Sequence, residues 1–189
     1  DNGVINGSVN TDLINTVTHL VVDFLDITDL TGIEDFTALT YLECQENHLT
    51  SLDLSGNPAL TYLACSDNHL TNLNLNQNSS LTDLEGYNNQ LTDLDLSENS
   101  ALTYLSLGLN HLVSLDLSVN SALTFLNCIG NQLLSLDVSQ NTALTYLDFS
   151  FNELTSLDVS QNTALTVLAG SSNQLTSLDL RNGNNTFLQ

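Results

Sequence analysis

The sequence predicts a single-domain β-solenoid, a right-handed coil that carries short parallel strands on two sides and very little helix. The stretch SLDVSQNTALT occurs at residues 135–145 and again at residues 156–166, twenty-one residues later. Leucines recur at the same interval along most of the chain, and each repeat alternates apolar and polar residues in short runs. Self-similarity at such a period is typical of solenoids, in which each coil buries its apolar residues only against its neighbours.

The regular repeat covers residues 39–185 and consists of seven units of 21 residues. Leucine occupies places 1, 4, 11 and 14 of every unit, and asparagine occupies place 9 of every unit. Place 19 is asparagine in six units and Gly183 in the last. Each half of a unit alternates inward apolar with outward polar residues, as a short strand does. We therefore expect two extended segments per coil, parallel ladders between coils, and asparagines that satisfy backbone groups at the turns.

The two end regions depart from the repeat. The sequence of residues 1–38 predicts an N-terminal cap followed by a divergent first coil over residues 17–38. The only short helices that we expect in the chain lie in residues 10–16 and 33–38. Residues 186–189 are expected to begin a C-terminal continuation, because the ends of a solenoid need a cap and the sequence shows none after the last unit.

The repeat carries a family resemblance. The unit LxxLxxxxNxLxxLDLSxNxx resembles the 21-residue class of bacterial leucine-rich repeats with nested halves of ten and eleven residues. The stretch ITDLTGIEDFTALTYL, at residues 27–42, is similar to the internalin-type start of such an array. Together they are most similar to secreted leucine-rich repeat proteins of marine and gut Bacteroidetes. The resemblance covers residues 17–185 and implies a binding role and a secreted or cell-surface location, with no catalytic residue to carry over.

Charge excludes several classes of partner. The chain has 22 acidic residues, one arginine (Arg181) and no lysine, so it repels phosphate backbones and we expect no nucleic-acid partner. No apolar run approaches the roughly 20 residues of a membrane helix, so we expect no membrane insertion. No set of nucleophile, base and orienting residue appears, nor a glycine-rich phosphate loop. We therefore expect no enzyme and no required cofactor.

The first half of the unit varies between coils at the outward places 3, 5 and 8, whereas the second half is nearly constant. Aromatic rings interleaved with carboxylates suit recognition, because rings supply contact area at low entropic cost. The candidate partner-binding residues are Tyr41, Tyr62, Asp83, Tyr104, Phe125, Tyr146, Glu43, Glu85 and Asp148. The leading hypothesis is a protein partner. One alternative is that the protein of a marine or host-associated bacterium binds a glycan along the tyrosine column, with calcium as a further ligand. Another is that the rings only stabilise their own ladder.

An aspartate occupies place 15 of every unit except one, where Asn74 replaces it. Its neighbours at places 14 and 16 point inward, so the aspartates are expected to form an outward column with rungs about 4.8 Å apart. Calcium prefers such oxygen ligands and could bridge adjacent rungs. The alternative is a column that is simply solvated. The candidate metal ligands are Asp95, Asp116, Asp137 and Asp158.

Histidines and cysteines give weaker signals. His48 and His69 occupy place 10 of successive coils, each two residues after a carboxylate at place 8, so zinc and a solvated turn are both open interpretations. Cys44, Cys65 and Cys128 share the inward place 6 and are expected to be core thiols. Cys44 and Cys65 lie on adjacent rungs, which leaves a disulfide between them open.

Overall fold

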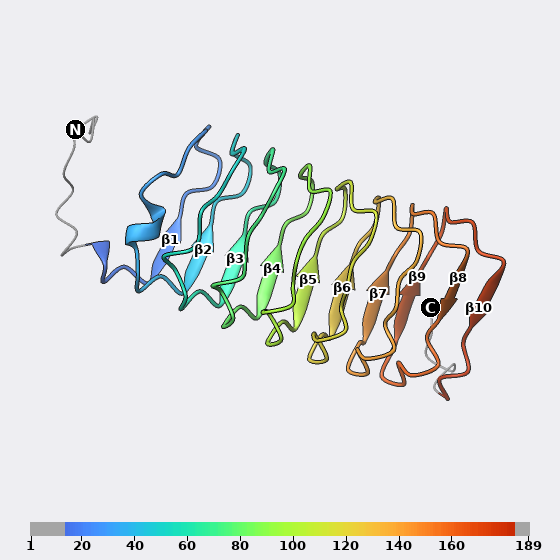
Figure 1. The fold of residues 1–189 in the computed structure, drawn as a ribbon. Coiled ribbons are helices and arrows are strands. Elements are labelled where there is room, and N and C mark those ends of the chain that lie inside the picture. The colour runs from blue at the N-terminus through green and yellow to red at the C-terminus, as the bar shows by residue number, and fades with distance from the viewer. Residues whose placement is uncertain (1–13, 184–189) are drawn as a thin grey trace.

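The computed structural model describes residues 14–183, which form a single stack of coils (Figure 1). Eight short parallel strands line one side of the stack, each beside the strand of the next coil. This arrangement confirms the predicted solenoid of one divergent and seven regular coils. The strands are β1 (His19–Val21), β2 (Tyr41–Glu43), β3 (Tyr62–Ala64), β4 (Asp83–Glu85), β5 (Tyr104–Ser106), β6 (Phe125–Asn127), β7 (Tyr146–Asp148) and β9 (Val167–Ala169).

The register of the sheet follows the repeat length. Tyr41 pairs with Tyr62, one unit of 21 residues apart, and the same offset holds from β2 through β9. His19 pairs with Tyr41 across the longer divergent coil, so β1 keeps the register although its coil differs in sequence. Because each strand is in register, one place of the repeat forms one column along the stack.

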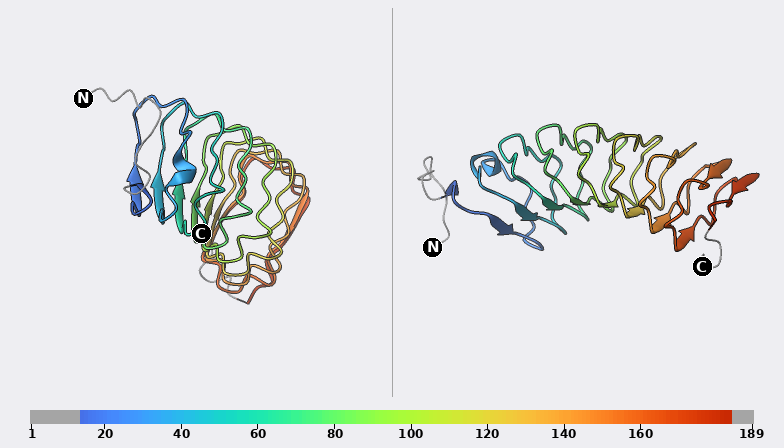
Figure 2. Two further views of the ribbon diagram at one scale, coloured as in Figure 1. Left: turned by 60° about the vertical axis from the view of Figure 1, so that its left-hand side comes forward. Right: turned by 90° about the horizontal axis from the view of Figure 1, so that it is seen from below.

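The opposite side of the stack has strands only near its C-terminal end. There β8 (Ser156–Asp158) pairs with β10 (Ser177–Asp179) in parallel, and the other described coils have no strand at this place. Figure 2 shows the coils continuing around this side as extended connections. The predicted second ladder is therefore confined to the last coils, and no continuous strand ladder sets the spacing of the aspartate column before β8.

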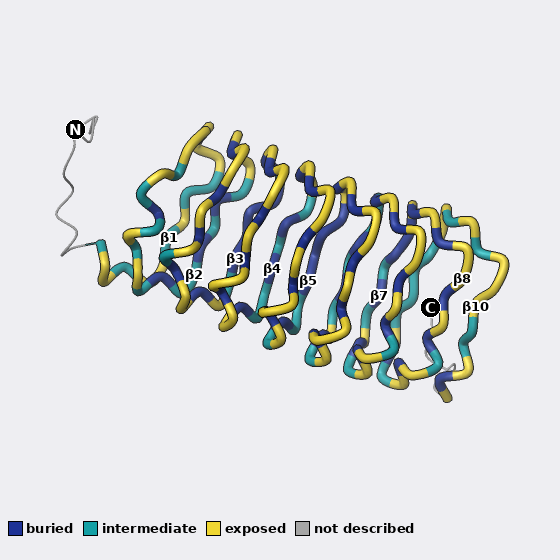
Figure 3. The backbone as a smooth tube through the Cα atoms, in the orientation of Figure 1, coloured by how far each residue is buried: buried dark blue, intermediate teal, exposed yellow. Residues whose placement is uncertain are grey.

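The core is a column of leucines enclosed by the coils. Leu42, Leu63 and Leu84, at place 4, are fully buried, as are the leucines at places 1 and 11 through most of the array. In Figure 3 the buried residues follow the inner surface of successive coils, while the exposed residues lie at the turns and on the opposite side. Each buried leucine contributes roughly 1.5–3 kcal/mol relative to an exposed one, so adjacent coils hold each other in place.

Asparagines of place 19 join the coils on the side that lacks strands. The Nδ2 atom of Asn78 donates to the backbone carbonyls of Leu54 and Asn57 in the preceding coil, at 3.2 and 2.9 Å. Within the described part of the chain, the Oδ1 atoms of these six fully buried asparagines have no hydrogen-bond partner. The Nδ2 donors alone therefore link the coils here. In the last unit Asn182 donates to the carbonyl of Asn162 at 3.5 Å, one place before Gly183.

The divergent coil contains the one described helix, the 3₁₀ helix η1 (Ile33–Asp35), which is shorter than the predicted residues 33–38. The first regular coil has Gly56 opposite this helix, and a Cβ at Gly56 would lie 2.0 Å from the carbonyl oxygen of Glu34. Only glycine allows that approach. No helix among residues 14–183 is long and apolar enough to cross a membrane. Most of the predicted helix at 10–16, most of the cap, and residues 186–189 lie outside the described residues.

Candidate binding face

Side chains at places 3, 5 and 7 point away from the core on the side of the eight-stranded sheet, and we call this surface the strand face. Places 3 and 5 lie within the strands, where most of their residues are half-buried. The structure thus brings all nine predicted partner-binding residues onto one surface. It adds place 7, because the alternation continues beyond each strand end. Place 7 holds Gln45, Ser66, Tyr87, Gly108, Ile129, Ser150 and Ser171.

The rings of place 3 form two stacks. Tyr41 and Tyr62 lie with centroids 4.4 Å apart and planes 6° from parallel. Phe125 stacks between Tyr104 and Tyr146, with centroid distances of 4.3 and 4.4 Å. Asp83, in strand β4, separates the two stacks. Such close stacking stabilises the ladder, and it leaves the rings partly exposed.

The N-terminal stack is joined to carboxylates. The Tyr41 hydroxyl donates to Glu43, and the Tyr62 hydroxyl donates to Glu85 Oε1 of the next coil at 2.8 Å. Burial and the neighbouring Glu85 raise the pKa of Tyr62, and the hydrogen bond to Glu43 raises the pKa of Tyr41. These hydroxyls therefore stay protonated, and this half of the face presents neutral rings beside the carboxyl groups of Glu43 and Glu85.

The C-terminal half of the strand face is more apolar. Tyr87 and Ile129 both lie over Gly108, where an added Cβ would be 2.8 Å from the tyrosine ring and 2.6 Å from Ile129 Cγ2. Asp148, the carboxylate of this half, accepts the backbone N–H of Ser150 at 2.9 Å. Sequence reasoning missed Tyr87 and Ile129. The sequence signal that could have revealed them is Gly108, which lies between them at place 7 of the repeat.

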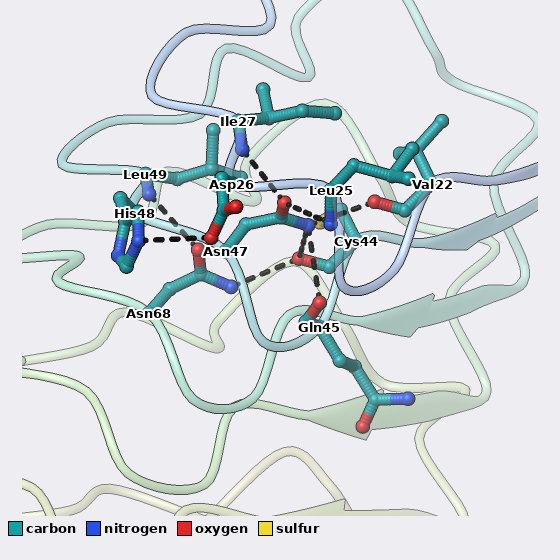
Figure 4. Close-up of polar contacts among 10 residues, drawn as sticks. All are labelled: Val22, Leu25, Asp26, Ile27, Cys44, Gln45, Asn47, His48, Leu49 and Asn68. Atoms are coloured by element: carbon teal, nitrogen blue, oxygen red, sulfur yellow. Dashed lines mark hydrogen bonds and ion pairs between the residues drawn. The ribbon is translucent and has the colours of Figure 1, made fainter.

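Buried asparagines of place 9 hold the turns that follow the strands (Figure 4). Asn47 Oδ1 accepts the backbone N–H groups of Leu25 and Ile27, at 3.2 and 2.9 Å, and its Nδ2 donates to the Val22 carbonyl at 2.8 Å. In the next coil, Asn68 Oδ1 accepts the N–H of Leu49 at 3.0 Å. These bonds confirm that the asparagines satisfy backbone groups at the turns.

Place 8 does not belong to the strands, which corrects the expectation that it lines the strand face. Its residue adopts the left-handed backbone region in all seven regular coils, with φ between 48° and 66°. It therefore forms a tight turn whose side chain lies at the edge of the sheet. The residues are Glu46, Asp67, Asn88, Leu109, Gly130, Phe151 and Ser172.

The aspartates of place 15 are exposed, as predicted, except for the half-buried Asp179, and each makes a local turn. Asp116 Oδ1 accepts the backbone N–H of Ser118 at 2.9 Å, and Asp137 does the same with Ser139. These hydrogen bonds hold the pKa of Asp116 and Asp137 below the usual value. Asp95 and Asp158 make the same contact. Among residues 14–183 no group of three or more His, Cys, Asp and Glu side chains is placed to hold a metal ion.

The carboxylate next to His48 is Asp26 of the divergent coil, and not a carboxylate of place 8 as the sequence suggested. His48 Nε2 lies 3.4 Å from Asp26 Oδ1, and the rings of His48 and His69 stack with centroids 5.7 Å apart.

The three cysteines of the chain are buried free thiols, so Cys44 and Cys65 are not joined by a disulfide. Burial raises the pKa of Cys65 and of Cys128 to about 12, as expected for inert core thiols.

Comparison with solved structures shows that the chain is similar to leucine-rich repeat proteins. The functional domain of InlJ from Listeria monocytogenes, which includes a cysteine ladder, is 46% identical with a TM-score of 0.90, covering 94% of this chain and 39% of that one. The Listeria monocytogenes internalin InlC2 is 25% identical with a TM-score of 0.79, covering 95% of this chain and 82% of that one. The LRIM1/APL1C complex is 26% identical with a TM-score of 0.65, covering 93% and 39%.

No protein-family model and no curated protein matches the chain. The chain spans 39% of the InlJ domain and 57% of a second internalin, InlF. Its parallel-strand solenoid, with almost no helix within residues 14–183, matches these leucine-rich repeat neighbours. The fold is therefore that of a leucine-rich repeat solenoid, and the neighbours support the prediction of an internalin-like leucine-rich repeat protein.

Proposed function

We propose that the chain is a binding module that contacts a protein partner through the strand face. The observation that carries the proposal is the pair of ring stacks, set beside carboxylates, on a surface that varies between coils. The opposite side repeats almost the same residues in each coil. A surface that differs from rung to rung can select one partner, whereas a uniform one cannot.

The size of the strand face fits a protein rather than a small ligand. Eight strands at about 4.8 Å spacing extend for about 34 Å along the axis. A standard protein interface buries about 800 Å² on each partner, which a surface of this length can supply. The rings are already held by stacking and hydrogen bonds, so binding would cost little side-chain ordering. The InlJ domain, the internalins and the LRIM1/APL1C complex support a binding role rather than an enzymatic one.

The location that we propose is secreted or cell-surface. Its support is the resemblance of the repeat to that of secreted bacterial leucine-rich repeat proteins, and of the divergent coil to the internalin-type start. We further propose the Bacteroidetes group as the source of the most similar proteins. Fractionation of a cell that expresses the full-length natural protein, with protease shaving of intact cells, tests the location. A protein found only in the cytoplasm would contradict it.

The binding proposal is tested by a screen of extracellular proteins with the purified chain, followed by surface plasmon resonance on each hit. Tyr104→Ala combined with Tyr146→Ala should weaken binding at least tenfold, because it removes both outer rings of the C-terminal stack. The matched control, Gln140→Ala combined with Gln161→Ala, changes exposed residues of the opposite side and should have no effect. Partners that bind both variants equally would overturn the strand face as the site.

Glycan binding along the tyrosine column, with calcium as a further ligand, is the second candidate. Polar hydroxyls beside stacked rings are the observation that favours it, since Tyr41 and Tyr62 present both. A glycan array probed with and without calcium separates the two candidates. Specific polysaccharide binding that is lost on Tyr62→Ala with Tyr104→Ala would replace the protein-partner proposal.

A further inference from the structure

A groove runs along the turns that follow the strands, between the side chains of places 8 and 10, and we call it the turn groove. It consists of two open cavities of about 580 and 590 Å³. The first extends from Phe24 to Gln90 and the second from Asn88 to Gln132, and they share the residues 88–90. The groove therefore crosses six consecutive coils without interruption. It is separate from the strand face, whose residues occupy places 3, 5 and 7.

The floor of the turn groove offers few free hydrogen-bonding groups. The asparagines of place 9 lie there, and their amides are already used by the backbone. Asn89 Oδ1 accepts the N–H of Leu70 at 3.0 Å, and its Nδ2 donates to the Cys65 carbonyl at 3.0 Å. Recognition in the groove must therefore come from the two walls.

Three carboxylates line the walls of the N-terminal cavity. Asp26, Glu46 and Asp67 line it, together with two of the four histidines of the chain. Asp26 lies against His48, which stacks on His69, and Asp67 Oδ1 accepts a hydrogen bond from Asn88 Nδ2 at 2.6 Å. The chain has no lysine, and Arg181 is occupied by Asp179 far along the stack, with Nε 2.9 Å from Oδ1. The chain itself thus supplies no permanent cation to this cavity.

The second cavity has an apolar wall at Leu109. This leucine is 44% exposed and adopts a left-handed backbone with φ of 52°, at a place where the other coils have Glu, Asp, Asn, Gly, Ser and, outside this cavity, the exposed Phe151. A β-carbon in this region costs roughly 1–2 kcal/mol, and asparagine or aspartate reduces that cost. Gly130 in the next coil leaves room for the leucine, because a Cβ there would lie 2.6 Å from Leu109 Cδ2. Leu109 therefore lies over Gly130 and offers an exposed apolar contact in this part of the groove.

We propose that the turn groove binds an extended segment of a protein, with Lys or Arg side chains against the anionic cavity and an apolar side chain on Leu109. Charge complementarity selects the cationic half, since the walls carry three carboxylates and no lysine or arginine. Six coils at about 4.8 Å spacing give a groove about 24 Å long, which matches roughly seven residues of extended chain at about 3.3 Å each.

The test is selection of octapeptides displayed on phage against the immobilised chain, with the affinity of each selected peptide measured by fluorescence anisotropy at 150 mM salt. The expected peptides combine Lys or Arg at one end with a Leu, Ile or Phe at the other. The groove variant Glu46→Gln with Asp67→Asn should weaken them at least tenfold. Leu109→Asn should also weaken them tenfold while keeping or raising the melting temperature, because asparagine suits the left-handed turn.

Two controls make the result decisive. Asp93→Asn with Glu98→Gln removes the same charge from exposed residues outside the groove and should change affinity less than twofold. Equal weakening by both pairs would show diffuse attraction to the acidic chain and overturn the proposal. Selected peptides without cationic residues, or peptides that bind Leu109→Asn as well as the parent chain, would also overturn it. Tyr104→Ala with Tyr146→Ala should leave peptide binding intact, so failure of the strand-face proposal is distinguishable.

Discussion

The Oδ1 atom of Asn110 accepts the backbone N–H of Leu91 in the preceding coil at 3.0 Å. Its Nδ2 atom donates to the carbonyl of Gly86 in that coil at 2.9 Å and to Leu107 and Gly108 in its own coil. One buried amide thus joins two coils and closes the turn between them. The same relationship recurs from the first regular coil to the last, which explains why place 9 never varies.

Asn110→Ala should destabilise the chain by about 2–4 kcal/mol, because it leaves buried backbone donors and acceptors without partners. Asn120→Ala is the comparison, since its side chain makes only two donor bonds and its Oδ1 has no partner in the described chain. We expect it to cost clearly less. Urea denaturation followed by circular dichroism measures both. Equal losses would show that the hydrogen bonds do not set the stability.

Asp116→Asn should leave the melting temperature unchanged or slightly higher, because asparagine can keep the turn bond to the Ser118 N–H. Asn74 already makes this bond in its own coil, with the Asn76 N–H at 3.1 Å. Asp116→Ala removes the acceptor and should lower the melting temperature. Differential scanning calorimetry compares the two variants. An alanine variant as stable as the asparagine variant would contradict the turn role of the column.

Calcium binding by the aspartate column stays a prediction. If it occurs at Asp95, Asp116, Asp137 and Asp158, millimolar calcium should raise the melting temperature far more than sodium chloride of equal ionic strength. Asp116→Asn with Asp137→Asn should remove most of that difference. The same melting curve in calcium, in chelator and in matched sodium chloride would leave the column as a solvated set of turns.

Acid should destabilise the chain partly through the aspartate column. The N–H bonds from residues 55, 97, 118 and 139 lower the pKa of Asp53, Asp95, Asp116 and Asp137, and Arg181 lowers that of Asp179 to about 2. A carboxyl group whose pKa is lower in the folded state stabilises the fold at pH values above its unfolded pKa of about 3.9. This contribution is lost as the pH falls toward 2. Asparagine at the first four positions should make the acid loss of melting temperature shallower. An unchanged acid profile would contradict this assignment.

Gly170→Ala should destabilise the last coils, because its Cβ would lie 2.1 Å from Phe149 Cζ. Phe149 is 1% exposed and cannot move outward without opening the core. Overpacking of this kind typically costs about 1–3 kcal/mol. Phe149→Leu should recover much of the loss when combined with Gly170→Ala, although it costs stability alone. A double variant no more stable than Gly170→Ala would show that the ring is not the obstacle. Thermal melting of all three variants decides.

Most of the fold could be predicted from the sequence, because in a solenoid the contacts of a residue repeat with the sequence itself. A constant leucine at place 4 has one consistent location, the core, and a constant asparagine at place 9 has one role, the turn. The nine residues of places 3 and 5 could be placed on one surface for the same reason: a fixed period in register converts spacing along the chain into a column in space.

Other features depended on contacts between coils and could not be predicted from the repeat. From the repeat, place 8 is expected to be an outward strand residue, but it lies in a left-handed turn. Hydrogen bonds to the following coil hold this turn; the Leu109 N–H, for example, donates to the Ile129 carbonyl at 2.8 Å. The grouping of rings into two stacks, the approach of Tyr87 and Ile129 over Gly108, and the continuous turn groove likewise arise only when coils are stacked. Sequence alone determined which residues share a column, because the period is constant. Tertiary structure decided which columns touch, because that depends on the backbone angle at each turn and on side-chain volumes in neighbouring coils.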